Sequence, residues 1–208
     1  MLRHWKLPRE PNHDGEPRLI PRLFLVAPEG DVGHLAACLE QACAAGDVAS
    51  LLVPPSVAKD LAPTAQALGV AVIAAGEPRD AARAGCDGLQ VDADPEAIAE
   101  ARKALGKDRY IGAFAGTSRH AAMEAAEAGA DYVAFNQNGP SLGGETLIHW
   151  WADMMEIPCV AFDPAEPGDL DTLLPQKPDF IRPSDAMWAS PEAARAVIEA
   201  LTARLHST

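Results

Sequence analysis

The sequence is dominated by a repeated unit in which a helix ends at glycine and a short apolar strand follows almost at once. The unit reads "AGCDGLQV" at residues 84–91 and "AGADYVAF" at residues 128–135. In both copies an aspartate stands between the glycine and the strand. A helix that leads so quickly into a strand is half of a β–α–β crossover, and such crossovers place successive strands parallel to one another.

Strands and helices alternate in this way from residue 19 to the end of the chain. Eight strands are expected, at 22–27, 48–54, 70–75, 87–91, 109–114, 131–135, 157–162 and 179–183. Their mostly apolar residues are typical of strands covered on both faces, and their connections are only a few residues long apart from the intervening helices. Eight parallel strands are enough to close a sheet, so we predict one compact (β/α)₈ TIM barrel over residues 19–208.

The structural alternative is an open, doubly wound sheet. Such a sheet should carry a glycine-rich dinucleotide turn after its first strand, and "VAPEGDVG" at 26–33 does not fit G-x-G-x-x-G. The barrel is therefore favoured. Residues 1–18 are charged and proline-rich, and we expect an extended or disordered N-terminal arm there.

Helix starts are marked by capping residues. Asp31 precedes one apolar-periodic segment, Asp94 and Pro95 precede another, and Ser190 stands before the final helix. Thr117 or Ser118 is expected to cap the alanine-rich helix that follows the fifth strand. These caps fix the first turn of each helix and so support the strand–helix count.

Charge and composition narrow the classes of partner. The formal net charge of −13 repels nucleic acid and anionic lipid, so neither is an expected partner. No apolar run reaches the roughly 20 residues of a membrane span, and the first residues lack the apolar core of a secretory signal. The four cysteines show no C-x-x-C spacing and are expected as buried thiols in a reducing compartment. We therefore expect a cytoplasmic protein.

Four stretches together resemble a known family in order and spacing. They are "RLFLVAP", "AGCDGLQVDAD", "YIGAFAGTSRHAAMEAAEAGADYVAF" and "SPEAARAVIEAL". The chain resembles, over residues 20 to 205, the thiamin phosphate synthase and thiazole tautomerase family. Members join a pyrimidine diphosphate to a thiazole phosphate with Mg²⁺, or aromatise the thiazole phosphate. The resemblance implies a small phosphorylated heterocyclic ligand and Mg²⁺ for this chain, with association into a homo-oligomer left open.

The resemblance carries a first group of candidate residues at the fourth strand. There the family's His-Leu-Gly-Gln aligns with residues 90–93, which makes Gln90 a candidate substrate-binding residue and Asp92 a candidate Mg²⁺ ligand. Mg²⁺ prefers carboxylate oxygens and water, so Asp92 suits that role. Asp94 could ligate Mg²⁺ as well, but the alternative is that it caps the helix that follows, and we favour that interpretation.

A second group lies after the fifth strand, where the family carries Ser-x-His. Alignment from Gly129 places Ala115 and Thr117 at those positions, and Ser118 and His120 stand slightly downstream. Thr117, Ser118 and His120 are the candidate catalytic residues. The helix start and Arg119 beside it form a candidate anion seat. The structural alternative for His120 is a solvated side chain.

The remaining candidates follow the sixth and eighth strands. Asn136 opens the polar loop "NQNGPSLGGE" at 136–145, which is either a lid or an ordinary surface turn. Ser184 stands where the family has a Ser-Ala turn, and Arg182 supplies positive charge near it. Asn136, Arg182 and Ser184 are therefore expected to bind substrate or phosphate.

Other positions depart from the family pattern. The second strand ends in residues 52–55, Leu-Val-Pro-Pro, instead of Gln, Arg and Lys, and the third ends in Ala-Ala-Gly instead of Asn-Asp-Arg. After the seventh strand, Asp163 and Pro164 replace two glycines whose N–H groups hold a phosphate in the family. Aspartate repels phosphate, and proline has no N–H to donate.

Three hypotheses about function follow. The chain is a diverged thiamin phosphate synthase-type transferase that binds a phosphorylated heterocycle at the carboxyl ends of the strands, or a non-catalytic ligand-binding or regulatory member of the same family. The third hypothesis is an unrelated small-molecule enzyme using Asp92, Asp163 and Asp185 with His120 or Glu29. Because phosphoryl-group chemistry relies on positioned charge, the lost cations predict a large loss of rate.

Overall fold

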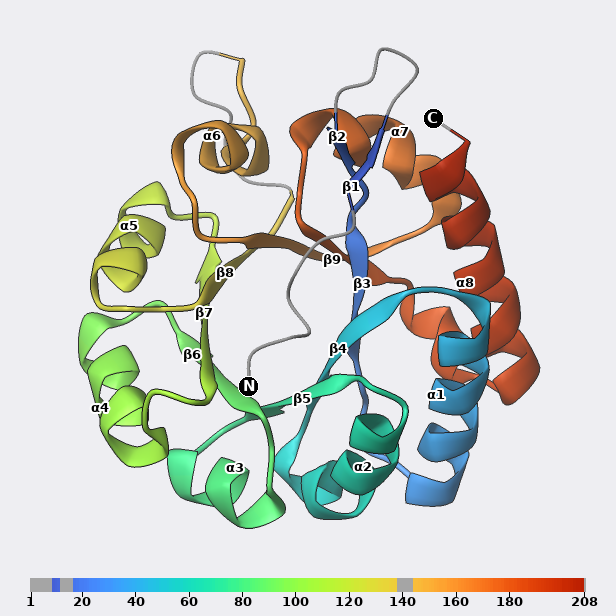
Figure 1. Ribbon diagram of the computed structural model, residues 1–208, viewed down its shortest axis with the longest axis horizontal. Coiled ribbons are helices and arrows are strands. Elements are labelled where there is room, and N and C mark those ends of the chain that lie inside the picture. The colour runs from blue at the N-terminus through green and yellow to red at the C-terminus, as the bar shows by residue number, and fades with distance from the viewer. Residues whose placement is uncertain (1–8, 12–16, 138–143, 208) are drawn as a thin grey trace.

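The structure is a computed structural model and describes residues 9–11, 17–137 and 144–207. Eight parallel strands close into a barrel in the order β10-β3-β4-β5-β6-β7-β8-β9. Figure 1 shows the strands as a ring with the helices outside it. The predicted (β/α)₈ barrel is confirmed, and the open sheet is excluded.

The barrel strands lie close to their predicted positions. They are β3 (Arg22–Val26), β4 (Val48–Val53), β5 (Ala71–Ala75), β6 (Gly88–Asp92), β7 (Tyr110–Gly116), β8 (Tyr132–Phe135), β9 (Cys159–Ala165) and β10 (Phe180–Pro183). The largest difference is β9, which begins and ends later than predicted. Its pairing with β10 shifts register between Ile181 and Pro183, so residues 162–164 form an irregular stretch. Such bulges re-aim side chains beside functional sites.

The outer helices also begin where their caps predict. They are α1 (Val32–Ala45), α2 (Pro55–Ala67), α3 (Pro78–Ala84), α4 (Pro95–Leu105), α5 (Arg119–Glu127), α6 (Leu147–Met154), α7 (Leu170–Leu173) and α8 (Pro191–His206). Asp31, Asp94, Ser118 and Ser190 each accept a backbone N–H of the first turn. Three short 3₁₀ segments that the sequence did not predict are η1 (Pro167–Asp169), η2 (Leu174–Gln176) and η3 (Asp185–Trp188).

Alternation along the strands divides the core into two parts. One set of side chains fills the barrel interior, including Phe24, Ile73, Tyr110, Tyr132 and Phe180. The other set packs outward against the helices. Because successive strand residues point to opposite faces, the inward set continues toward the carboxyl ends of the strands. That continuation decides which side chains reach the mouth of the barrel.

The aspartates of the repeated unit pin neighbouring strands together at their amino ends. The carboxylates of Asp87, Asp131 and Asp179 accept the N–H groups of Val72, Ile111 and Cys159 at 2.8, 2.7 and 2.8 Å. In each pair the aspartate N–H donates back to the carbonyl of the same residue. The aspartate that follows glycine in both copies of the sequence repeat is therefore a structural clamp.

Two short strands precede the barrel. β1 (Arg9–Pro11) and β2 (Pro17–Leu19) pair antiparallel to each other, in a separate two-stranded sheet. Apart from Leu19, they fall within the expected N-terminal arm of residues 1–18, the rest of which lies outside the described residues. Among the described helices, none is both long enough and apolar enough to cross a membrane.

Candidate active site at the carboxyl ends of the strands

A cavity of about 500 Å³ opens at the carboxyl ends of β5, β6 and β7. It is lined by Ala75, Gly76, Gln90, Val91, Asp92, Asp94, Ala97, Phe114 and Phe162. This face is where barrel enzymes place their active sites, because eight loops converge there. The cavity is therefore the candidate active site.

The polar wall of the cavity comes from β6 and the loop after it. The Tyr132 hydroxyl, inside the barrel, donates to Gln90 Oε1 at 2.8 Å and so fixes the orientation of the amide. Burial raises the pKa of Tyr132, so this hydroxyl remains a donor. Asp92 is exposed at the strand end. Asp94 accepts the N–H of Glu96 at 3.0 Å, which confirms its predicted role as the cap of α4.

The apolar wall is aromatic. The rings of Phe114 and Phe162 lie 5.3 Å apart between centroids, and Phe162 also meets Phe24 edge-on at 6.2 Å. Both cavity-lining rings pack against the barrel interior. Together they close the barrel below and present an aromatic surface to whatever enters the cavity.

Arg182 lies next to this aromatic wall. Its guanidinium is 5.3 Å from the centroid of the Phe162 ring, and Nη1 donates to the Phe162 carbonyl at 3.3 Å. Nη2 donates to both carboxylate oxygens of Asp185, at 2.8 and 2.9 Å. Nε is buried and has no hydrogen-bond partner among the described residues. The positive charge predicted near the eighth strand is therefore present but already paired.

The candidate residues at the start of α5 lie outside the lining of the cavity. Ser118 caps α5 by accepting the N–H of Ala121 at 3.1 Å. The His120 side chain is 84% exposed and lies 3.4 Å from Glu124. Thr117 is exposed as well. The exposed His120 side chain matches the solvated alternative. Thr117, Ser118 and His120 are not among the residues that line the cavity with Gln90 and Asp92.

Arg119 turns toward α6. Its guanidinium stacks over the Trp150 ring at 4.3 Å, and Nη2 lies 4.0 Å from Glu145. Nη2 has no hydrogen-bond partner among the described residues. The expected anion seat at the start of α5 therefore has its cation held against an aromatic ring.

The last candidates border the loops after β8 and β10. The N–H of Asn136 donates to the Gly116 carbonyl at 3.0 Å, and the N–H of Gln137 donates to Asp163 Oδ2 at 2.7 Å. Ser184 is buried and accepts the Ala186 N–H at 3.3 Å. Residues 138–143 of the expected lid lie outside the described residues.

Of the predicted residues, the structure brings Gln90 and Asp92 into one cavity and places Arg182 against its aromatic wall. Sequence reasoning missed Phe114 and Phe162 as lining residues. The alternation of inward and outward residues was the available signal, because Phe114 has the same parity as Tyr110. The parity of Phe162 depends on the β9 bulge.

The fit of Mg²⁺ to this mouth rests on a single side chain. Asp92 offers a solvent-facing carboxylate in the cavity, whereas the Asp94 carboxylate caps a helix and Gln90 Oε1 accepts from Tyr132. Mg²⁺ is commonly held by one or two carboxylates together with waters and substrate phosphates. The residues present therefore fit a Mg²⁺ ion that arrives with a phosphorylated ligand.

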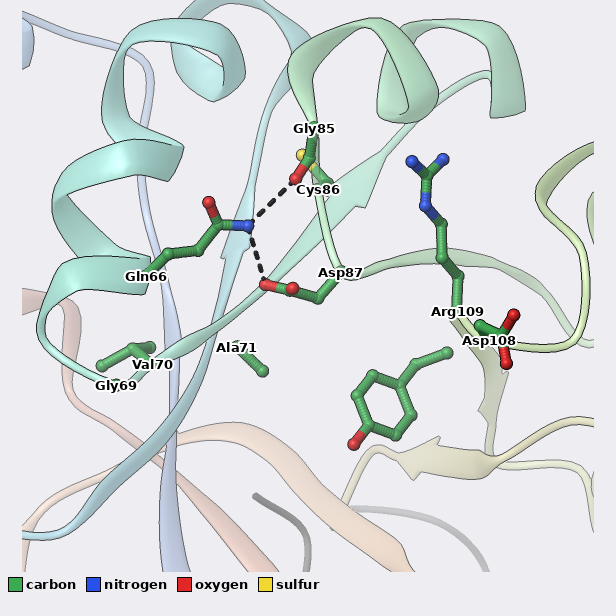
Figure 2. Close-up of a pocket in the computed structure, with 10 residues that line it drawn as sticks. Gln66, Gly69, Val70, Ala71, Gly85, Cys86, Asp87, Asp108 and Arg109 are labelled. Atoms are coloured by element: carbon green, nitrogen blue, oxygen red, sulfur yellow. Dashed lines mark hydrogen bonds between the residues drawn. The ribbon is translucent and has the colours of Figure 1, made fainter. Parts of the chain in front are cut away.

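A second cavity, of about 460 Å³, lies at the opposite end of the barrel. Figure 2 shows Gln66 on one side of it and Arg109 on the other. Gln66 Nε2 donates to the Gly85 carbonyl at 2.9 Å and to Asp87 Oδ2 at 3.1 Å. Since Asp87 is also a strand clamp, the polar groups on this side serve the fold.

Comparison with known proteins places the chain in a family. Residues 23–178 match the family model described as thiamine monophosphate synthase. The chain is 35% identical to the thiamine-phosphate synthase of Rhodospirillum centenum, over 85% of this chain and 94% of the relative. Identity to that of Hyphomonas neptunium is 32%, over 92% of this chain and 97% of the relative.

A solved structure agrees on the fold. The thiamine phosphate pyrophosphorylase from Pyrococcus furiosus superposes with a TM-score of 0.72 at 19% identity, covering 89% of this chain and 96% of that one. The resemblance predicted from the strand–helix repeats is confirmed by the family match and by the curated relatives. The chain belongs to the thiamine monophosphate synthase family.

Proposed function

We propose that this protein binds the heterocyclic substrates of thiamin phosphate synthesis at the carboxyl-end cavity and couples them only slowly. The observation that carries the proposal is the lining of that cavity. Among the described residues, aromatic rings and carboxylates contribute to it and cationic side chains do not. We infer the substrate class from the family, and the slow rate from the residues that line the cavity.

Binding of a flat heterocycle is favoured by the aromatic wall. Phe114 and Phe162 present their rings to the cavity, and Gln90 offers a fixed amide beside them. Stacking of aromatic rings contributes about 0.5–1.5 kcal/mol beyond the burial of their area. The amide N–H₂ of Gln90 can donate to a ring nitrogen, since its oxygen is engaged by Tyr132. A pyrimidine or thiazole fits this combination.

Slow coupling follows from the charges. Departure of pyrophosphate places negative charge on the leaving group, and enzymes stabilise such charge with cations, metal ions or N–H groups. The cavity lining contributes Asp92 and Asp94 instead. On the β9 side, Asp163 holds Gln137 and Pro164 has no N–H, so that loop gives the phosphate little. We therefore expect a rate several powers of ten below that of a fully equipped synthase.

Mg²⁺ would be held by Asp92 and by oxygens of the diphosphate, and would supply the charge neutralisation that the described lining of the cavity lacks. In this arrangement Gln90 would orient the ring, Phe114 and Phe162 would exclude water from one side of it, and Asp92 would hold the ion. Mg²⁺ should accordingly bind tightly only in the presence of the pyrimidine diphosphate.

The test combines binding and turnover. Calorimetry with the thiazole phosphate, and with the pyrimidine diphosphate with and without Mg²⁺, should give measurable affinity, whereas product formation should be slow. Phe162→Ala should weaken heterocycle binding, and Met154→Ala, a change of an exposed residue on α6, should not. Turnover at an ordinary synthase rate would refute the slow-coupling part, and no affinity for either compound would refute the function.

Asp92 and Asp94 provide a matched pair for the metal. Asp92→Asn should weaken Mg²⁺-dependent binding of the diphosphate, while Asp94→Asn should mainly loosen α4 by up to about 1 kcal/mol. Both residues line the cavity, so the two variants change its charge equally. Equal losses of Mg²⁺ dependence in the two variants would show that the metal role belongs to neither carboxylate alone.

A further inference from the structure

Arg182, at the mouth of the barrel, does not use all of its hydrogen-bond donors. Arg182 donates to Asp185 through Nη2 alone, and both carboxylate oxygens share that one nitrogen. Nη1 donates to a backbone carbonyl, and Nε has no partner among the described residues although it is buried. Buried donors without partners are uncommon, because each loses its hydrogen bonds to water.

In a second arginine–aspartate pair, the arginine donates to the carboxylate through two nitrogens. Arg22 donates to Asp47 through two nitrogens, Nε to Oδ2 and Nη2 to Oδ1, both at 2.7 Å. The exposed fractions of the two pairs are nearly the same, 13% and 55% for Arg22 and Asp47 against 15% and 57% for Arg182 and Asp185. Exposure therefore does not explain why the pair at the mouth leaves a donor unused.

We propose that Asp185 is a replaceable internal anion and that Arg182 exchanges it for a phosphate or diphosphate group of the ligand. A phosphate oxygen would take the Nε–H, and a second would take Nη2 from the carboxylate. Such a two-nitrogen fork is the arrangement in which arginine binds oxyanions most strongly. The inference rests on the proposed function for the identity of the ligand, but the exchange itself concerns only the anion.

The position of Arg182 supports this assignment. Its guanidinium rests on Phe162, whose ring also lines the cavity proposed for the heterocycle. The stacking holds the guanidinium plane while the carboxylate departs. Asp185 is more than half exposed, so water can solvate it after displacement.

The exchange makes Asp185 a residue that determines anion selectivity. A chloride ion gains little by displacing the Asp185 carboxylate, both of whose oxygens accept from Nη2 of Arg182. A phosphate group gains a second donor and a higher charge. Asp185 therefore favours multiply charged anions at Arg182 over the monovalent anions of the solution.

The test measures inorganic pyrophosphate binding by calorimetry at fixed ionic strength, without Mg²⁺. Asp185→Asn should tighten binding about threefold to tenfold, because the internal competitor is removed. In an Arg182→Gln background the same change should alter affinity less than about twofold. Asp47→Asn removes the same charge from the matched pair at the other end of the barrel and should leave affinity unchanged. Thermal unfolding of each variant verifies that it is folded.

Three results would overturn the exchange. These are an affinity that Asp185→Asn leaves unchanged or weakens, an equal gain in the Arg182→Gln background, and an absence of pyrophosphate binding by folded Asp185→Asn protein. The proposed function fails separately. A protein that follows the predicted pyrophosphate pattern but binds neither heterocyclic substrate would retain the exchange and lose the substrate assignment.

Discussion

The two ends of the barrel use the same residue types for different purposes. At the amino ends, the fork between Arg22 and Asp47 joins the starts of β3 and β4 through two nitrogens. At the carboxyl ends, Arg182 meets Asp185 through one nitrogen and keeps an unpartnered Nε. The two pairs are similarly exposed but differ in how many nitrogens they use, which supports our proposal that the carboxyl end binds an anion while the amino end stabilises the fold.

The strand clamps extend this contrast. Asp87, Asp131 and Asp179 each satisfy a backbone N–H of the preceding strand at the amino end of the barrel. At the opposite end Asp92 lies in the cavity, and the residues that line it at the end of β5 and just after it are Ala75 and Gly76. An aspartate that is bonded to backbone contributes to the fold, whereas one that faces a cavity is available to a ligand.

We expect the largest loss of stability from a variant that removes one of the strand clamps. Asp131→Ala removes the acceptor of the Ile111 N–H and the partner of Arg102, whose Nη2 lies 2.6 Å from the carboxylate. Leaving a buried donor unsatisfied costs about 1–3 kcal/mol, and the lost ion pair adds to that. We expect urea unfolding to show a loss of about 2–4 kcal/mol. Asp131→Asn keeps an acceptor and should cost clearly less.

Ligand binding is the counterpart measurement for the same variant. Because Asp131 lies at the amino end, folded Asp131→Ala protein should bind pyrophosphate as the unmodified protein does. A loss of affinity comparable to that of Arg182→Gln would contradict the division between the two ends. It would place the clamp among the groups that shape the mouth.

Two tyrosines inside the barrel test how far the division extends. Tyr132→Phe removes the hydroxyl that holds Gln90 and should cost about 1 kcal/mol of stability while changing heterocycle affinity. Tyr110 lines the cavity at the amino end, where burial raises its pKa to about 12. Tyr110→Phe should leave heterocycle affinity unchanged in calorimetry. Equal changes of affinity would show that the core couples both ends.

Much of the difference between the two ends of the barrel could be predicted from the sequence, and some of it could not. The eight alternations and the capping residues predicted the barrel because they act over a few neighbouring positions. The repeated aspartate was visible, but its role as a clamp required the strand pairing, in which Asp87 and Val72 become partners. Local patterns therefore defined the elements, and long-range pairing assigned the roles.

The details of the mouth were harder to predict. Phe162 and Arg182 meet because β9 and β10 shift register between Ile181 and Pro183, and periodicity does not reveal a bulge. Asp185 reaches Arg182 from the short segment η3, whose direction no alternation indicates. His120 follows the helix surface and faces solvent, although its spacing resembled a catalytic motif. The family resemblance indicated the candidate site, and side-chain direction decided which of the candidate residues line the cavity.

The pH dependence of stability tests whether the strand clamp Asp179 titrates as a buried carboxylate. Burial raises the pKa of Asp179, an effect opposed by the N–H of Cys159. The folded state then holds its proton to higher pH than the unfolded state does, so stability from this residue falls as pH rises above about 4 through the raised pKa. Asp179→Asn keeps an acceptor without titrating. Its stability relative to the unmodified protein should therefore increase over that range in urea unfolding, and a decrease would contradict the raised pKa.

The smallest expected effect compares the two arginine pairs directly. Asp47→Asn should cost about 0.5–1 kcal/mol, because Arg22 loses a partner on two nitrogens. Asp185→Asn should change stability by less than about 0.5 kcal/mol, since only one nitrogen of Arg182 loses its partner and the exposure of the two pairs is nearly the same. Both variants lower the net negative charge by one, so the relief of overall repulsion is similar in each. The difference between the two unfolding free energies therefore reports the pairs alone. If Asp185→Asn were the more destabilising of the two, the Arg182 pair would be a structural element, and its exchange for a ligand phosphate would be too costly to occur.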